Sequence, residues 1–138
     1  DLLFRDITIC KGGYIMYEVK TITHFSASHH LRDYNGPCEQ RHGHNWKVEV
    51  VYQHDTLNKV GIVIDFKILK QKVNSILDTL DHTDLNELEY FRKFNPSSEN
   101  IAAYVYMHLA KDHELMNAAR LQRVNVWETE TSCASYYE

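Results

Sequence analysis

The sequence has little of what builds disulfide frameworks, membrane spans or nucleic-acid surfaces. Its 138 residues include three cysteines, an odd number without CxxC spacing, so we expect free thiols in a reducing compartment. No apolar run approaches membrane-spanning length, and no signal-peptide pattern is visible. With 15 Lys and Arg against 19 Asp and Glu, the chain lacks the basic excess of a nucleic-acid binder. These absences predict one soluble, cytoplasmic domain.

The first 15 residues differ in character from the rest of the chain. Lys11-Gly12-Gly13 can be encoded by a purine-rich stretch that resembles a bacterial ribosome-binding site, and Met16 follows at a suitable distance. We therefore predict an N-terminal extension over 1–15, a translated leader, and a single domain over 16–138. The alternative is an ordinary additional strand, because "FRDITIC" alternates apolar and polar residues.

Alternation of apolar and polar residues predicts four strands, in residues 14–27, "HGHNWKVEVVYQ", "LQRVNVWETE" and "SCASYYE". A first helix is expected after Asp65, its N-cap, and runs to about Thr79. A second helix follows Pro96, and its predicted apolar stripe is Ile101, Tyr104, Val105, His108 and Leu109. This order predicts an α+β fold, an antiparallel four-stranded sheet with two helices on one face.

Three histidines have the spacing of a metal site. In "HGH", His42 and His44 lie on the same face of a strand, and His29 ends the preceding strand. Three imidazoles with an open fourth position are typical of catalytic zinc, so we predict Zn²⁺ at these residues. The alternative is a set of surface or satisfied core histidines, since an isolated HxH often occurs by chance.

Two further features suggest proton-transfer chemistry. Cys38 precedes the histidine pair by four residues, and a thiol beside a divalent cation ionises readily. In "LDHTDLN", Asp81 and His82 can share a hydrogen-bonded proton network. The alternative for this pair is a polar helix C-terminus, where a protonated histidine complements the helix dipole.

Six stretches in one order carry a family resemblance. They are "FSASHHL", "CEQRHGHNW", "GIVIDFKILK", "LDHTDLN", "NPSSENIA" and "VWETETSCASY". From Tyr17 to Tyr137 the chain resembles the 6-pyruvoyl-tetrahydropterin synthase superfamily. The resemblance implies the tunnel fold, in which sheets from three subunits close a barrel and two trimers stack into a homohexamer with active sites between subunits.

The resemblance also implies roles for individual residues. It implies zinc binding by His29, His42 and His44, proton transfer by Cys38, Asp81 and His82, and pterin-ring binding by Glu128. Ser97, Ser98 and Glu99 would complete the substrate pocket. For the two serines the alternative is plain helix capping, and for Glu128 it is an exposed strand carboxylate.

The spacing CxxxHGH resembles the 6-carboxy-5,6,7,8-tetrahydropterin synthases of queuosine biosynthesis. That resemblance implies zinc-dependent conversion of 7,8-dihydroneopterin triphosphate to 6-carboxy-5,6,7,8-tetrahydropterin, acetaldehyde and triphosphate. The CExxHGH form resembles members credited also with forming 6-hydroxymethyl-7,8-dihydropterin, which would make Glu39 a second base. The alternative is a solvated loop carboxylate.

Other functions and the triphosphate site stay open at this point. A 6-pyruvoyl-type synthase, a zinc hydrolase and a non-catalytic pterin-binding protein are the competing hypotheses. A hydrolase would normally use a carboxylate base, and a binding protein has no need of a full zinc triad. The triphosphate needs local cations, from Lys20, Arg32, Arg41 or a neighbouring subunit.

Overall fold

The computed structural model describes residues 15–138. The predicted extension over 1–15 and its alternative strand "FRDITIC" therefore lie outside the described residues, apart from residue 15. The long strands are β1 (Tyr17–His29), β2 (His42–His54), β4 (Arg120–Thr129) and β5 (Ser132–Tyr136). The two long helices are α1 (Phe66–Leu77) and α3 (Ser98–Ala110).

The sheet has the order β3-β1-β2-β4-β5. β1 and β2 pair antiparallel along their full length, which places His29 opposite His42 and Tyr17 opposite His54. The prediction of four strands was wrong by one, because β3 (Thr83–Asp84) adds a short parallel pairing to β1. Two residues are too few to show the alternation by which strands are recognised in sequence.

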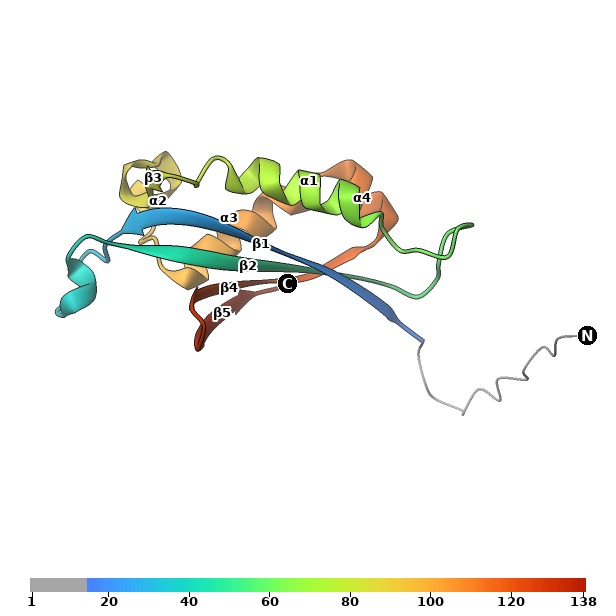
Figure 1. The fold of residues 1–138 in the computed structure, drawn as a ribbon, viewed down its shortest axis with the longest axis horizontal. Helices are drawn as coiled ribbons and strands as arrows, with labels where there is room; N and C mark the ends of the chain where they lie inside the picture. Colours follow the sequence, from blue (N-terminus) through green and yellow to red (C-terminus); the bar gives the residue numbers. More distant parts are fainter. Residues whose placement is uncertain (1–14) are drawn as a thin grey trace, which may run out of the picture.

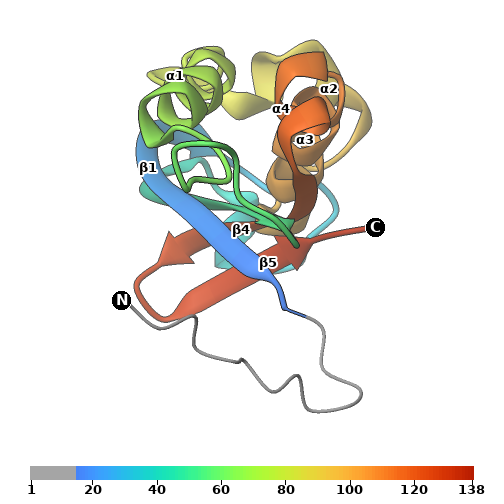
Figure 2. The same ribbon diagram turned by 90° about the vertical axis from the view of Figure 1, so that its right-hand side faces the viewer.

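The helices cover one face of the sheet and leave the other face bare (Figures 1 and 2). Alternate residues of β2, including Trp46, Val48, Val50 and Tyr52, are fully buried under them. α1 begins at its predicted cap, where the Asp65 carboxylate accepts a hydrogen bond from a backbone N–H, and it ends at Leu77 rather than Thr79. The α+β class with helices on one face is confirmed.

Two shorter helices were not predicted. α2 (Glu89–Lys93) lies between the two predicted helices, and α4 (His113–Ala118) precedes β4. Each is anchored by one fully or almost fully buried residue, Phe91 in α2 and Leu115 in α4. A single apolar residue gives no helical period, so the sequence pattern could not reveal them.

One predicted core residue is exposed. His108 was placed in the apolar stripe of α3, but the buried positions of that helix are Ile101, Ala102, Val105, Tyr106 and Leu109. The His108 ring instead lies against Tyr104, with Nδ1 2.8 Å from the Tyr104 carbonyl oxygen. Among residues 15–138, no helix is long and apolar enough to cross a membrane.

Candidate functional site

Three histidine rings meet where β1 ends and β2 begins. The His29 Nε2 and His42 Nε2 atoms are 3.0 Å apart, and the three ring centroids lie 4.5–5.2 Å from one another. His29 is buried, whereas His42 and His44 are partly buried. The full antiparallel pairing of β1 with β2 produces this meeting, because it places residue 29 opposite residue 42. The predicted triad is therefore brought together.

Backbone carbonyls fix how two of these rings present their nitrogens. His29 Nδ1 is 2.7 Å from the Pro96 carbonyl oxygen, and His42 Nδ1 is 2.6 Å from that of Gln40. A carbonyl only accepts, so each Nδ1 carries the proton and each neutral ring leaves its Nε2 lone pair free. Two unprotonated nitrogens 3.0 Å apart repel each other unless a cation or a shared proton lies between them. A second contact of this kind is how proteins orient metal-binding histidines.

Burial favours the uncharged form of two of the rings. It lowers the pKa of His29, and the hydrogen bond to the Pro96 carbonyl only partly offsets this effect. Burial also lowers the pKa of His44, against the opposing influence of the nearby Glu128 carboxylate. Neutral imidazole is the form that binds metals. The electrostatics of the cluster therefore suit a metal ion.

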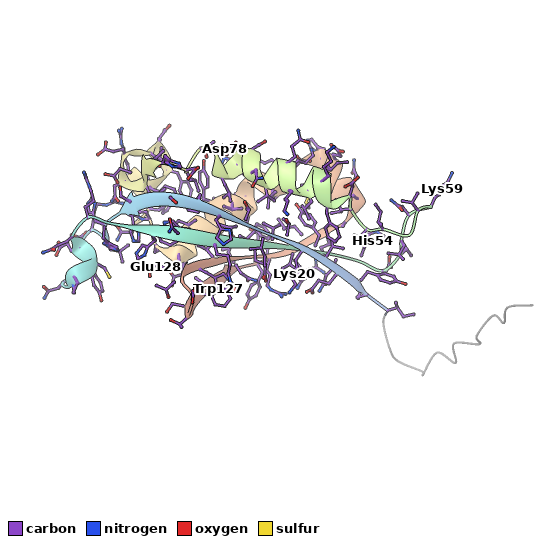
Figure 3. The ribbon with its side chains drawn as sticks, in the orientation of Figure 1. Lys20, His54, Lys59, Asp78, Trp127 and Glu128 are labelled. Atoms are coloured by element: carbon purple, nitrogen blue, oxygen red, sulfur yellow. The ribbon has the colours of Figure 1, made fainter. Side chains whose placement is uncertain are left out.

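Glu128 joins the histidines from β4, at the end of the molecule opposite the loop that carries Lys59 (Figure 3). Its Oε1 lies 3.3 Å from His29 Nε2 and 3.1 Å from His44 Nε2. His44 Nε2 is nevertheless a buried atom without a hydrogen-bond partner of acceptable geometry. One ligand atom from each of the four residues lies within 4.8 Å of the others. The donor set fits a divalent ion that prefers nitrogen and oxygen ligands, as Zn²⁺ does.

A pocket of about 200 Å³ opens beside this cluster and gathers most of the other predicted residues. Cys38 enters it from a short 3₁₀ turn, Pro37–Glu39, whereas Glu39 is exposed and does not line it. Ser97 also caps α3, since its hydroxyl accepts the Asn100 N–H at 3.2 Å. The residues lining the pocket are His29, Leu31, Cys38, Ser97, Ser98, Glu99, Glu128, Ser132, Cys133 and Ala134.

Asp81 and His82 do not line that pocket. They follow α1, and their side chains are in contact, with His82 Nδ1 2.9 Å from Asp81 Oδ2. His82 lines a separate shallow pocket with Ser26, Ser28 and Asn45, which His44 also borders. Cys38 and His82 therefore face different pockets of the same chain.

The cations suggested for a triphosphate also lie elsewhere. Lys20 is 4.0 Å from the Glu49 carboxylate, and Arg41 is 2.9 Å from that of Asp84. The Arg32 backbone is held by an asparagine side chain, as described below. None of the three lines the pocket beside the histidines.

Two asparagines that the sequence analysis did not single out hold the chain between His29 and Cys38. Asn86 accepts from His30 N–H and donates to the His30 carbonyl, at 2.9 and 3.0 Å. Asn95 makes the same pair of bonds to Arg32, at 3.0 and 2.9 Å. Both lie inside the quoted stretches "LDHTDLN" and "NPSSENIA", but neither carries ionisable chemistry that would have drawn notice.

Comparisons with known proteins agree with this geometry. The family model described as 6-pyruvoyl tetrahydropterin synthase matches residues 18–138. The chain is 34% identical to a 6-carboxy-5,6,7,8-tetrahydropterin synthase of Synechocystis, over 82% of this chain and 87% of that protein. It is 37% identical to a putative 6-carboxy-5,6,7,8-tetrahydropterin synthase of Archaeoglobus fulgidus, over 81% and 88%.

The fold is also similar to that of a solved structure. The 6-pyruvoyl tetrahydropterin synthase of Caenorhabditis elegans superposes with a TM-score of 0.80 at 26% identity, covering 89% of this chain and 96% of that one. The family match covers nearly all of the described residues and includes the three histidines. The chain belongs to the 6-pyruvoyl tetrahydropterin synthase family.

Proposed function

We propose that the protein is a zinc-dependent lyase that converts 7,8-dihydroneopterin triphosphate and water to 6-carboxy-5,6,7,8-tetrahydropterin, acetaldehyde and triphosphate. The observation that carries this proposal is the pocket in which Cys38 and Glu128 lie beside His29. Both relatives described above bear the name of a carboxytetrahydropterin synthase, one of them as putative. The CxxxHGH spacing of Cys38 and His42 agrees with that product.

The residues divide the chemistry among them. A zinc ion held by His29, His42 and His44 would acidify substrate hydroxyls and the adjacent C–H, as a Lewis acid does. Cys38, as thiolate, removes a proton from the substrate side chain, and His82, oriented by Asp81, returns one. Because His82 and Cys38 face different pockets of one chain, we assign this His82 to a neighbouring subunit, as expected for a barrel of three subunits.

Recognition of the pterin ring falls to the remaining polar groups of the pocket. The Glu128 carboxylate accepts two hydrogen bonds from the amino group and ring N–H, a bidentate fit. Ser98 and Glu99 stand at the N-terminal turn of α3 and line the same space. Ser97 supports that turn as its cap.

The direct test is product analysis. Zinc-loaded protein is incubated with 7,8-dihydroneopterin triphosphate, and we expect 6-carboxytetrahydropterin and acetaldehyde by mass spectrometry. Protein stripped with a chelator, then reloaded with zinc, is the matched control, and activity should disappear and return. No turnover of this substrate by the zinc-loaded protein would refute the proposal.

A different product is the main alternative, because the structurally similar Caenorhabditis elegans protein is named for 6-pyruvoyl tetrahydropterin. A dual enzyme that also forms 6-hydroxymethyl-7,8-dihydropterin would use Glu39 as second base. Cys38→Ala should then lose acetaldehyde formation but keep the hydroxymethyl product, and Glu39→Ala should do the reverse. In the described turn only Cys38 lines the pocket, which favours the dedicated synthase: both products absent in Cys38→Ala and no effect of Glu39→Ala.

A further inference from the structure

Glu128 adds a fourth possible ligand atom to the three histidine nitrogens. Around a tetrahedral zinc ion with bonds of about 2.0–2.1 Å, ligand atoms lie about 3.3–3.4 Å apart. The His29–His42, His29–Glu128 and His44–Glu128 separations are 3.0, 3.3 and 3.1 Å. Catalytic zinc sites usually have three protein ligands and leave the fourth position to water or substrate. Here a carboxylate oxygen lies within 3.3 Å of two of the three histidine nitrogens, and all four ligand atoms lie within 4.8 Å of one another.

We propose that Glu128 is a fourth metal ligand in the substrate-free protein and leaves the ion when substrate binds. The carboxylate would thus close the resting site and, once displaced by a substrate oxygen, turn to the pterin ring. The second half of this statement rests on the proposed function. The first half concerns only the metal and this chain.

Local backbone geometry aims Glu128 at the histidines. The ladder between β2 and β4 extends only to the pair Lys47–Trp127, one residue before Glu128. On the other side, the pairing of β4 with β5 shifts register between Trp127 and Thr129, so Glu128 lies in an irregularity. Bulges of this kind redirect a side chain without ending the strand. A carboxylate outside the regular ladder is free to take a second orientation.

No lysine or arginine among the described residues forms an ion pair with this carboxylate. Among the described residues, only His29 and His44 lie within ion-pair distance of Glu128. The Nε2 atom of neutral His29 has no proton to donate to the carboxylate, since the ring proton is on the Nδ1 atom that faces the Pro96 carbonyl. Two acceptors at 3.3 Å are stable together only with a cation or proton between them. A metal ion bound by all three groups satisfies this requirement.

The pocket offers space for a second position of the Glu128 side chain. Its side chain is 31% exposed and lines the pocket of about 200 Å³ together with Ser98 and Glu99. In that pocket a displaced carboxylate meets the donors of an incoming heterocycle, and bidentate hydrogen bonds to ionised carboxylates are among the strong ones. A carboxylate that binds the metal until substrate displaces it would protect the metal from water and other anions.

The test uses Co²⁺ in place of zinc, because its visible spectrum reports coordination, with azide as a probe for an open position. Glu128→Gln keeps the size of the side chain but is a much poorer ligand. Glu130→Gln, an exposed carboxylate two residues along the chain, is the control for charge. Zinc affinity is measured in parallel by competition with a chelator.

We expect Glu128→Gln to lower zinc affinity by at least the roughly 10–100-fold seen when groups that support metal ligands are removed. It should also change the Co²⁺ spectrum and bind azide more tightly than the parent, whereas Glu130→Gln should match the parent in all three measurements. Equal zinc and azide affinities in parent and Glu128→Gln would overturn the proposal. If that variant fails to fold, the parent decides alone, because azide that binds it as readily as an open three-histidine site contradicts a fourth protein ligand.

The displacement step is tested separately with 7,8-dihydroneopterin, which carries the diol but no triphosphate. Its addition to the Co²⁺-loaded parent should change the spectrum, and Glu128→Gln should bind it more weakly. If 7,8-dihydroneopterin changes the spectrum but binds Glu128→Gln as tightly as the parent, then Glu128 does not bind the pterin ring after it leaves the metal. The zinc, Co²⁺ and azide measurements can support Glu128 as a ligand even if the protein binds no pterin. In that case the proposed function fails and the metal-ligand proposal stands, so the two failures are distinguishable.

Discussion

The histidine cluster and the Asp81–His82 pair differ in how much of their surroundings one chain supplies. His29 is 1% exposed, and carbonyl groups of the same chain orient both its ring and that of His42. The His82 side chain is 83% exposed, and its only described charged neighbour is Asp81. Groups of the same chain therefore orient the histidine cluster, whereas little of the described chain surrounds the His82 side chain.

The backbone at His82 strengthens this contrast. His82 has a φ of 56°, in the left-handed region, where a residue other than glycine costs about 1–3 kcal/mol. The conformation is held by two bonds to Ser26, one from His82 N–H to the Ser26 carbonyl and one from Ser26 N–H to Asp81. A strained and exposed residue maintained in this way is typical of a functional site. The difference supports the proposal that His82 of one chain serves the pocket of another.

The largest expected effect tests the histidine cluster by comparing the two ends of β2. His42 begins that strand and His54 ends it. His42→Ala removes one ligand and should lower zinc affinity by more than about 100-fold, beyond the range for supporting groups. His54→Ala should leave zinc binding unchanged. Bound zinc is measured after dialysis by atomic absorption, and equal zinc in the two variants would contradict the assigned ligands.

The assignment of His82 to a neighbouring subunit is tested by mixing two inactive variants. Cys38→Ala and His82→Ala should each be inactive alone, because each lacks one of the two proton-transfer groups. If the groups of one site come from different subunits, random mixing after reversible dissociation restores about a quarter of the sites. A mixture of Cys38→Ala with His42→Ala is the control, because one chain supplies both residues to a site and no intact site can form. No recovery in the first mixture would place the whole site within one chain.

A smaller effect on turnover is expected from Asn95, which holds the chain between His29 and Cys38. Asn95 holds Arg32, and Leu31 N–H in turn donates to the Cys38 carbonyl at 2.8 Å. Asn95→Ala should therefore misplace the thiol and lower kcat by about tenfold, with KM and zinc content nearly unchanged. The control is Asn58→Ala, because Asn58 similarly accepts backbone N–H groups in the loop after β2. A parallel loss of zinc would show a general structural role instead.

The sequence predicted that the three histidines would lie together, because their meeting follows from strand alternation and one long strand pairing. Alternation along a strand places His42 and His44 on one face, and the long run of paired residues between β1 and β2 carries His29 to them. The four long strands and two long helices were predicted for the same reason, since each has enough residues to show its period.

What the sequence missed depends on contacts between distant segments. The proximity of Glu128 to His29 and His44 arises from the pairing of β2 with β4 and an irregularity after Trp127, which no local pattern encodes. The same holds for Asn95, 63 positions from its partner Arg32. β3 and α2 were missed because two and five residues carry too little periodicity.

The smallest effect concerns the exposed pair and its dependence on pH. The Ser26 N–H holds the pKa of Asp81 below its ordinary value of 3.8, helped by the hydrogen bond with His82 and against the effect of partial burial. A carboxyl whose pKa is lowered on folding stabilises the folded state above its unfolded pKa, and this contribution is lost as pH falls through the folded value. The loss should therefore be seen only below about pH 3.8.

Asp81→Asn isolates this contribution, because the amide oxygen can still accept the Ser26 N–H but does not titrate. Urea midpoints are compared at about pH 5 and about pH 3, and the decrease on acidification should be slightly smaller in Asp81→Asn than in the parent. Asp55→Asn is the control, since that carboxylate is largely exposed at the far end of the sheet, beside His54. A decrease in Asp81→Asn equal to that of the parent would mean that Ser26 fixes the loop without lowering the pKa. The strain at His82 would then be supported by hydrogen-bond geometry alone.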